Sequence, residues 1–384
     1  MFITKNSMKI VLYGVETNNK GAELMLYAIL QEIERRHPYA KVYIPLSRIK
    51  QGLSYVKTTI DLRYWPFDKL IKITHFNGLL KHLGFPIIKQ KCFVNSDYFF
   101  DGSGFLFSDQ TKLWNTTPKW WEDILYNQYK KGAKIVFLPQ AFGPFQEEKT
   151  QMAMVALNKY ATVIMSRERV SYDFIKSSGL VDMSKVKLFT DFTSLVEGVF
   201  PESYSYLRDG ICIIPNMRMI DSGSISFENY ISLLSAIIHE GKKTGRPVYL
   251  LNHEGKIDEN LAYKCQQSVD GSIDVVTGLN ALEVKGLISS AYLVITSRFH
   301  GLVSSLNSCV PSLSTSWSHK YEELYHDYKL AGYVLPLNNR DQAILQVEKL
   351  LLENENRKIR EHLAKQIPLI KSKTKEMWNY IWSL

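Results

Sequence analysis

The sequence is poor in the residues that build disulfide frameworks and metal sites. Only four cysteines occur in 384 residues; they lie far apart without CxxC spacing, and the nine histidines are scattered. Because zinc sites need closely spaced Cys or His, we expect no metal ion and no disulfide scaffold. Cys212 in GICIIP and Cys309 in LNSCVPSL stand in apolar runs, which predicts reduced thiols in a protein core.

Long hydrophobic runs are also missing. No stretch approaches the apolar length needed to cross a bilayer, and the first residues, MFITKNSMKIVLYGV, contain neither a leader-type apolar region nor a small-residue cleavage site. We therefore expect a cytoplasmic protein that is neither secreted nor inserted in a membrane. GxGxxG, Walker A and GxSxG motifs are absent too, which argues against a dinucleotide-binding fingerprint, a P-loop ATPase and a serine hydrolase.

The composition that remains is that of an ordinary globular protein. Hydrophobic residues make up 45% and charged residues 22%, and a length of 384 residues favours two domains over one. Lys and Arg outnumber Asp and Glu by 47 to 38, and the net charge of +9 attracts phosphates, carboxylates, nucleic acids or anionic membranes alike. No recognised RNA- or DNA-binding motif accompanies this charge, so we expect no nucleic-acid partner.

Apolar, β-branched runs alternate with amphipathic segments along the chain. The run KIVLYGV is followed by a polar loop, a helix-like segment and the run KVYIPL, and the same alternation starts again at GICIIPN. This order predicts an α/β protein with two Rossmann-like, doubly wound domains facing a cleft. We place the domains at residues 1–204 and 205–345, with a helical segment at 346–384 that could pack back on the first domain.

Residues 48–91 interrupt the first domain with a basic insertion. It contains nine lysines or arginines against two aspartates, together with several aromatic side chains. Such a segment suits an anionic membrane surface or an anionic acceptor. A solvated helical insertion explains the same composition, and both interpretations stay open.

Ligands of open α/β sheets bind beyond the carboxyl ends of the strands. Polar residues follow the apolar runs at 18–21, 101–104, 140–144, 166–168, 216–218, 252–254 and 297–301. The sharpest case is VITSRFHGLVSSL, where Arg298 offers a planar fork for a carboxylate or phosphate, next to the N–H groups that open a helix. His300 would stand beside it as proton donor or hydrogen bonder, although a structural Arg and His would leave the same pattern.

Several blocks occur in an order that resembles the polysaccharide pyruvyl transferase family over roughly residues 8–345: GVETNNKGAELM, DGSG, LPQAFGPF, MSRERVSYDFI, TDFTSLV and VITSRFHGLVSSLNSCVPSLSTSWSHKYEEL. The resemblance implies a GT-B-like fold. It also implies transfer of the pyruvyl group of phosphoenolpyruvate to a sugar of a surface polysaccharide, or of its lipid-linked precursor, as a cyclic ketal. Free phosphate would be the second product, and no cofactor is implied.

The resemblance also implies site residues. Phosphoenolpyruvate would be bound by Arg298, Phe299, His300, Gly301, Arg167 and Lys320. The sugar acceptor would face Asn18, Asn19, Lys20, Gly21, Asp101, Gly102 and Arg218. We expect His300 to be the general acid or the group that stabilises the phosphate, and Asp101 to be a base or a sugar binder.

Two other functions fit the same residues. One is a nucleotide-sugar glycosyltransferase of the same fold, and the other is a non-catalytic protein that binds anions or sugars. If the acceptor is a lipid-linked oligosaccharide, the basic insertion at 48–91 would place the enzyme at the anionic inner face of the cell membrane.

Overall fold

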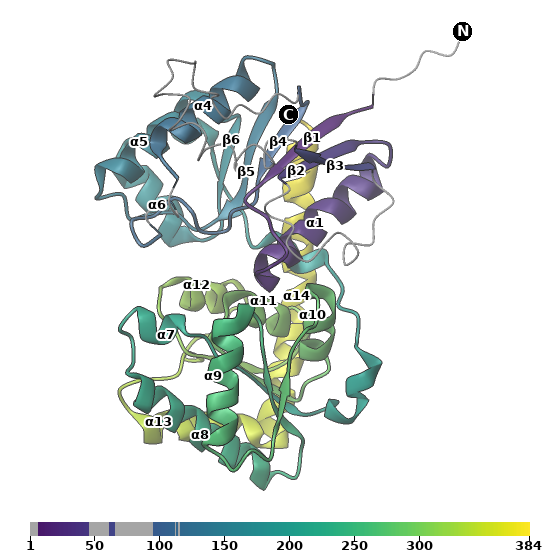
Figure 1. The fold of residues 1–384 in the computed structure, drawn as a ribbon, viewed down its shortest axis with the longest axis vertical. Coiled ribbons are helices and arrows are strands. Elements are labelled where there is room, and N and C mark those ends of the chain that lie inside the picture. Colours follow the sequence, from purple (N-terminus) through teal and green to yellow (C-terminus); the bar gives the residue numbers. More distant parts are fainter. Residues whose placement is uncertain (1–6, 46–60, 66–94, 112, 114–115) are drawn as a thin grey trace, which may run out of the picture. The chain divides into compact units, whose positions relative to one another are not determined.

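The computed structural model describes residues 7–45, 61–65, 95–111, 113 and 116–384, and the chain divides into two compact units. The first unit consists of Met1–Asn18, Met25–Phe192 and Glu376–Leu384, and the second of Asn19–Leu24 and Thr193–Lys375. Helices α1 (Lys20–Arg36) and α14 (Glu353–Trp382) each contribute residues to both units (Figure 1).

The first unit is built on a seven-stranded parallel sheet in the order β3-β2-β1-β4-β5-β6-β7. Its strands are β1 (Lys9–Tyr13), β2 (Lys41–Pro45), β3 (Asp61–Trp65), β4 (Tyr98–Asp101), β5 (Lys134–Gln140), β6 (Val163–Ser166) and β7 (Val186–Leu188). Besides α1, its helices are α4 (Pro118–Tyr129), α5 (Glu148–Tyr160) and α6 (Arg169–Ser178). The winding reverses between β1 and β4, which makes this the topological switch point of the sheet.

Both faces of this sheet are covered. On one face Val11, Phe99 and Phe137 join a hydrophobic cluster with Trp121 of α4 and residues of α5 and α6. On the other face the Phe100 ring lies against the last turns of α14, with its centroid 6.3 Å from that of Trp378. Burial on both faces explains why the strands read as continuous apolar runs in the sequence.

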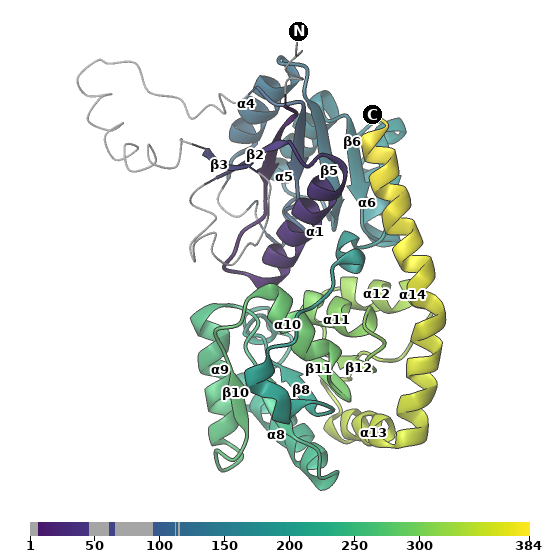
Figure 2. The same cartoon turned by 90° about the vertical axis from the view of Figure 1, so that its right-hand side faces the viewer.

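The second unit repeats the plan with a five-stranded parallel sheet in the order β10-β9-β8-β11-β12 (Figure 2). Its strands are β8 (Ile211–Ile214), β9 (Val248–Leu251), β10 (Asp274–Val276), β11 (Leu293–Thr296) and β12 (Ser312–Ser314). Its helices, besides α14, are α7 (Arg218–Asp221), α8 (Phe227–Lys243), α9 (Gly255–Gln267), α10 (Ala281–Ser289), α11 (Phe299–Leu306), α12 (Lys320–Asp327) and α13 (Arg340–Leu351).

Strand β8 shows how the second core is divided. Ile211 and Ile213 belong to a cluster with residues of α8, α9 and α13, whereas Cys212 and Ile214 belong to a cluster with residues of α10. Successive side chains of a strand point to opposite faces, so the two clusters lie on the two sides of the sheet. Its switch point falls between β8 and β11. The prediction of two Rossmann-like α/β sheets is confirmed.

Most of the basic insertion at 48–91 lies outside the described residues. Within it, Asp61–Trp65 forms β3, which pairs in parallel with β2 at the edge of the first sheet. This part is therefore a strand, and the interpretation of the whole insertion as helical is wrong for these residues. Pairing of a parallel strand is a long-range contact that leaves no helical or turn signal in the local sequence.

Three absences can be stated for the described residues. None of their helices combines the length and apolarity needed to cross a bilayer. They contain no group of three or more His, Cys, Asp or Glu placed to hold a metal ion. Their three cysteines are free thiols, and burial raises the pKa of Cys212 and of Cys265 to about 12, so neither is a nucleophile at neutral pH.

Candidate functional site

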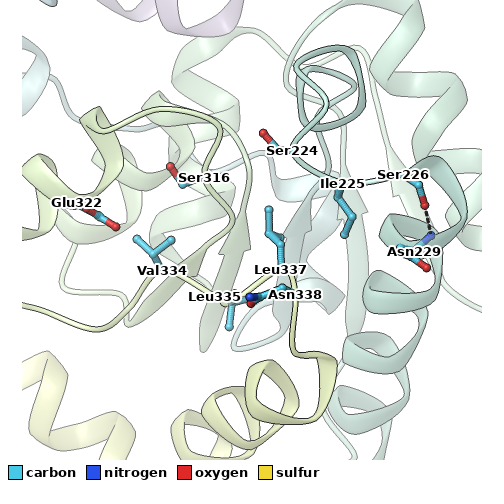
Figure 3. Close-up of a pocket in the computed structure, with 10 residues that line it drawn as sticks. All are labelled: Ser224, Ile225, Ser226, Asn229, Ser316, Glu322, Val334, Leu335, Leu337 and Asn338. Carbon is cyan, nitrogen blue, oxygen red and sulfur yellow. Dashed lines mark hydrogen bonds between the residues drawn. The ribbon is translucent and has the colours of Figure 1, made fainter.

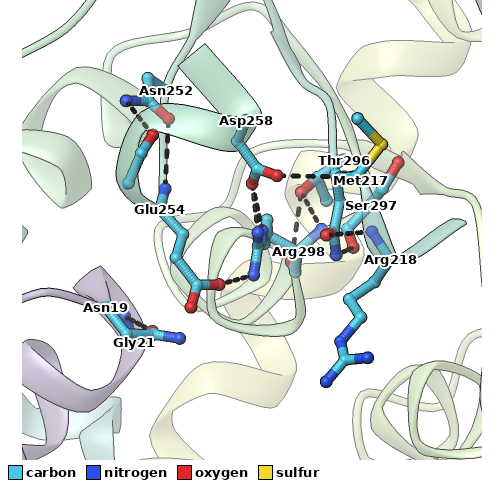
Figure 4. A network of polar contacts seen from close by, with 12 residues as sticks. Asn19, Gly21, Met217, Arg218, Asn252, Glu254, Asp258, Thr296, Ser297 and Arg298 are labelled. Atoms are coloured by element: carbon cyan, nitrogen blue, oxygen red, sulfur yellow. Dashed lines mark hydrogen bonds and ion pairs between the residues drawn. The ribbon is translucent and has the colours of Figure 1, made fainter. Parts of the chain in front are cut away.

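Three loops meet at the switch point of the second sheet. The loop after β8 carries Asn216, the loop after β9 carries Glu254, and the loop after β11 carries Arg298 (Figure 4). In parallel sheets the carboxyl ends of neighbouring strands lie at one edge, and the reversal of winding opens a crevice there. The polar residues predicted from the ends of apolar runs at 216–218, 252–254 and 297–301 therefore come together in one unit.

Hydrogen bonds from side chains to backbone groups fix the loop that bears Arg298. The carbonyl of Ser297 accepts hydrogen bonds from Asn216 Nδ2 at 2.8 Å and from the Tyr321 hydroxyl at 2.7 Å. The Thr296 hydroxyl accepts from the backbone N–H of Arg298 at 3.0 Å and donates to its carbonyl at 3.1 Å. These contacts hold the guanidinium at the start of α11, where the N–H groups of the first helical turn point outward.

Two carboxylates hold the guanidinium of Arg298. Its Nε donates to Asp258 Oδ2 at 2.8 Å, its Nη2 contacts the same oxygen, and its Nη1 contacts Glu254 Oε2. The other oxygen of Asp258 accepts from the backbone N–H of Met217 at 3.0 Å. Asp258 on α9 thus ties the loop after β8 to the loop after β11.

The electrostatics of this cluster reflect its partial burial. Burial lowers the pKa of the Arg298 guanidinium to about 10. Burial also raises the pKa of the Asp258 carboxyl to about 7, against the hydrogen bond from the Met217 N–H, which favours its charged form. Both charges have left most of their water, so each depends on the other for stabilisation.

The loop before α1 joins this cluster. Residues 19–24 belong to the second unit, and Asn19 forms an isolated antiparallel bridge with Glu254. The Asn19 carboxamide oxygen accepts from the N–H of Gly21 at 2.9 Å. A Cβ at Gly21 would overlap Nδ1 of His300, so glycine is the residue that lets this imidazole approach the loop.

His253 lies in the loop after β9 and is buried. Its burial, followed by the charges of Arg298, His300 and Lys20, holds the pKa of His253 well below the ordinary value. Lys20 itself is buried and contacts Glu23 through Nζ at 2.8 Å. Basic side chains from three separate segments therefore lie within electrostatic reach of one another in the second unit, and this arrangement suits an anion.

The structure places the other residues of the expected donor set around this cluster. Phe299 is buried, with its ring centroid 5.4 Å from that of His300. A Cβ at Gly301 would lie 2.7 Å from the Thr296 hydroxyl, so Gly301 allows α11 to pack closely on β11. Lys320 is the first residue of α12 and is buried, with Nζ 4.0 Å from the centre of the Trp317 ring, a cation–π contact.

Arg218 is the first residue of α7 and is exposed. Its charge disfavours the charged form of Arg298, and within the described part of the chain it forms no ion pair. Figure 4 shows its guanidinium extending away from the contacts between Asp258 and Arg298. Arg218 is thus a cation available to a ligand at the end of β8.

The remaining predicted residues belong to the first unit, beyond β1, β4 and β6. Asn18 is half-buried in the loop after β1, and the Gly102 N–H donates to the Tyr13 carbonyl at 2.8 Å. Asp101 ends β4 and is fully buried; its carboxylate accepts from the Ser103 hydroxyl at 2.8 Å and from Gln140 Nε2 at 2.9 Å. These bonds fix the carboxylate at the switch point of the first sheet.

Arg167 follows β6 and is buried. Its Nη1 lies 3.5 Å from Asp191 Oδ2, and its Nε lies 3.8 Å from Glu168 Oε2. The neighbouring Arg169 is exposed and pairs with Asp173. The two arginines of SRER thus have opposite environments: Arg167 is buried among carboxylates, and Arg169 is exposed on α6.

A separate cavity of about 460 Å³ in the second unit does not suit an anion (Figure 3). Its lining is mainly hydroxyl, amide and apolar: Ser224, Ile225, Ser226, Asn229, Ser316, Glu322, Val334, Leu335, Leu337 and Asn338. The charged member is Glu322, which repels a phosphate or a carboxylate. The arginine cluster suits an anion better.

Two residues of the site carry contacts that sequence reasoning missed. Glu254 was expected only as part of a polar loop, and Asp258 was not expected at all. Their spacing of four residues at the start of a helix is a usable signal, because it places both carboxylates on one helical face. Their common partner follows β11, a strand separated from β9 in the sheet by β8, and local sequence does not show this pairing.

Two doubly wound parallel sheets with ligand-type residues at the switch points define the GT-B-like class of α/β proteins. Solved structures agree. HepE from Anabaena in complex with UDP and glucose has a TM-score of 0.61 at 11% identity, covering 98% of this chain and 100% of that one. UDP-GlcNAc 2-epimerase from Neisseria meningitidis bound to UDP-GlcNAc has a TM-score of 0.61 at 10% identity, with the same coverage of both chains.

The glycosyltransferase WaaG of lipopolysaccharide biosynthesis has a TM-score of 0.56 at 11% identity, covering 97% of this chain and 99% of that one. At such identities the likeness shows the fold alone. No curated protein sequence matches the chain. The family is shown by sequence: the polysaccharide pyruvyl transferase model matches residues 19–319, and the chain belongs to this family.

Proposed function

We propose that the protein transfers the pyruvyl group of phosphoenolpyruvate to a sugar of a surface polysaccharide, or of its lipid-linked precursor, and releases phosphate. Membership of the family supports a transferase of polysaccharide biosynthesis. One observation carries the donor assignment: the partly open guanidinium of Arg298 stands at the start of α11 with His300, His253 and Lys20 within electrostatic reach.

The donor fits the charges of this cluster. Phosphoenolpyruvate carries its carboxylate and its phosphate close together on the same small molecule, and a confined site must neutralise the charges of both. Arg298 supplies a planar fork for one of them, and the outward N–H groups of α11 with His300 supply donors for the other. Arg167 and Lys320 are proposed as further donor contacts on the basis of the family motif.

The reaction needs acid and base. Protonation of the methylene carbon of the enol gives an oxocarbenium-like centre, which a sugar hydroxyl attacks while losing its proton to a base. Departure of phosphate gives a second oxocarbenium-like centre, and attack by a second hydroxyl, which loses its proton to the departing phosphate or to the base, closes the ketal. We assign the proton donor, or the group that stabilises the leaving phosphate, to His300.

We assign Asp101 to the acceptor side as base or sugar binder, together with Gly102, Arg218 and residues 18–21. Asp101 accepts hydrogen bonds from the backbone N–H and hydroxyl of Ser103 and from Gln140, and these bonds hold its carboxylate in place for either role. A lipid-linked acceptor would bring the enzyme to the inner face of the membrane. The segment proposed to meet it, at 48–91, lies mostly outside the described residues.

Thermal denaturation tests the donor first because it needs no acceptor. We expect millimolar phosphoenolpyruvate to raise the wild-type midpoint, since a ligand at a hundredfold excess over its Kd stabilises by about 2.7 kcal/mol. Arg298→Ala should abolish the rise. Arg246→Ala is the matched control, because Arg246 also pairs with a carboxylate, Asp209, but precedes β9 at the opposite edge of the sheet.

The competing function is tested in the same experiment. Similar folds were solved with UDP, UDP-GlcNAc or glucose, so UDP sugars are the comparison ligands. Stabilisation by UDP sugars and not by phosphoenolpyruvate would replace the proposal with a nucleotide-sugar glycosyltransferase. Stabilisation by phosphoenolpyruvate without phosphate release on any sugar acceptor would point to a binding protein.

A further inference from the structure

The two carboxylates that bind Arg298 differ in their exposure to solvent and in the number of their contacts. The Asp258 side chain is 2% exposed and the Glu254 side chain is 35% exposed, while that of Arg298 is 14% exposed. Together they engage Nε, Nη1 and Nη2 of one guanidinium through three of its five N–H donors. An anionic ligand that takes over the Nη1 N–H bound by Glu254 must displace that carboxylate.

Asp258 cannot leave easily. It accepts from Nε and Nη2 of Arg298 and from the backbone of Met217, and it belongs to the buried side of α9. Exposing this carboxylate would break three contacts and leave the Met217 N–H without its acceptor. Loss of a buried acceptor costs the full desolvation of its donor.

Glu254 can leave. Its carboxylate reaches Nη1 alone, and more than a third of its side chain is open to solvent. It occupies the N-cap position of α9 without making a side-chain cap to the helix, so its carboxylate has no helical hydrogen bond to lose. Water can replace what Glu254 gives up, which makes the exchange inexpensive.

We propose that Glu254 competes with the carboxylate of the donor for Nη1 of Arg298, whereas Asp258 stays bound and orients the guanidinium. The inference rests on the proposed function, because it takes the donor to bind Arg298. Glu254 then determines donor affinity: the apparent Kd equals the intrinsic Kd divided by the fraction of molecules whose Nη1 is open. Asp258 is a positioning residue and contacts no ligand.

Competition by Glu254 for Nη1 predicts a specific pattern of ligand affinities. Every ligand that places a carboxylate on Nη1 is weakened by the same factor, whatever its other charges. Simple repulsion by Glu254 would instead weaken a ligand more as its total charge rises. Phosphoenolpyruvate and pyruvate share the carboxylate and differ by the phosphate, so the pair separates the two explanations.

The experiment measures the Kd of phosphoenolpyruvate and of pyruvate for the full chain by titration calorimetry. Glu254→Gln should tighten both ligands by the same factor, about tenfold, because a neutral amide competes poorly with a carboxylate. Glu259→Gln is the control; it removes the same charge from the same helix at a residue that pairs with Lys256. Asp258→Asn should weaken both ligands, and its pH profile should lose any transition that the wild type shows near pH 7.

The outcomes separate the two proposals. Suppose that the wild type binds phosphoenolpyruvate and that Arg298→Ala abolishes this binding. If Glu254→Gln then binds no more tightly than the wild type, the inference is overturned and the proposed function stands. Tightening of phosphoenolpyruvate without equal tightening of pyruvate, or equal tightening in Glu259→Gln, also overturns it. Absence of phosphoenolpyruvate binding in wild type and in Glu254→Gln overturns both proposals.

Discussion

Arg167 and Arg298 have similar ion-pair partners but differ in how far these partners are exposed to solvent. Each follows a parallel strand at its carboxyl end, and each faces two carboxylates of its own unit. Around Arg167 all three side chains are nearly closed to solvent, at 4% for Arg167 and 5% for both Asp191 and Glu168. Around Arg298 the exposure rises from 2% at Asp258 to 35% at Glu254.

The difference separates an internal ion cluster from an exchangeable one. A sealed cluster admits an anion only by moving buried charges, which is costly, so we expect Arg167 to contribute less to donor binding than Arg298. A cluster with one solvent-exposed carboxylate can exchange that partner for a ligand. The same residue types at the carboxyl end of a parallel strand therefore differ in accessibility for function.

The largest effect should come from breaking the sealed cluster. Arg167→Ala leaves Asp191 and Glu168 buried without their cation, and we expect a loss of about 3–5 kcal/mol in the free energy of unfolding. Arg298→Ala should cost less, since it removes the cation from one buried carboxylate, Asp258, and not from two, and since Glu254 can turn to water. Urea denaturation of both variants measures the difference, and equal losses would show that exposure does not distinguish the clusters.

Glycines beside the two switch points give the next largest contrast. Gly21→Ala forces a methyl group against the imidazole of His300, and displacement of that group should lower phosphate release by roughly ten- to a hundredfold. Gly102→Ala instead meets the side chain of Val15 at 2.8 Å, which is a packing cost of about 1–3 kcal/mol. If Gly21→Ala loses stability and keeps its activity, His300 has no part in turnover.

Acid should weaken the second unit through His253. Because the folded-state pKa of His253 lies well below its ordinary value, the unfolded chain binds a proton that the folded one does not, and stability falls as pH drops below about 6.5. The slope is at most about 1.4 kcal/mol per pH unit for one proton. We expect His253→Gln to flatten the dependence of the unfolding midpoint between pH 7.5 and 5.5. His239→Gln, an exposed position on α8, should leave it unchanged.

The smallest effect should come from a solvent-exposed ion pair close in sequence to the buried Arg167 cluster. Arg169 and Asp173 pair on α6 with side chains 63% and 53% exposed. Removing the pair by Arg169→Ala should change the free energy of unfolding by less than about 0.5 kcal/mol, because solvent screens it. A larger loss in urea denaturation would mean that position in the chain, and not burial, determines the cost at this loop.

Sequence reasoning reached the fold because parallel strands buried on both faces leave continuous apolar runs, and these runs alternate with amphipathic helices. It reached the loop of Arg298 because a β-branched run there breaks into polar residues. It did not reach the partners of Arg298, since strand order in space decides which loops meet. Nor does anything local in residues 19–24 indicate that they group with Thr193–Lys375.

The first residues of α1 belong to the second unit and the others to the first, which limits how the chain can be shortened into fragments. Residues 19–24, which bring Gly21 to His300 and Asn19 to Glu254, are separated by 168 residues of the first unit from the remainder of the second unit. A gene fragment starting at Thr193 would encode the whole five-stranded sheet but would lack residues 19–24, which lie beside Glu254 and His300. Half-proteins made for ligand screening should therefore carry residues 19–24 as a grafted segment, or donor binding will be measured on an incomplete site.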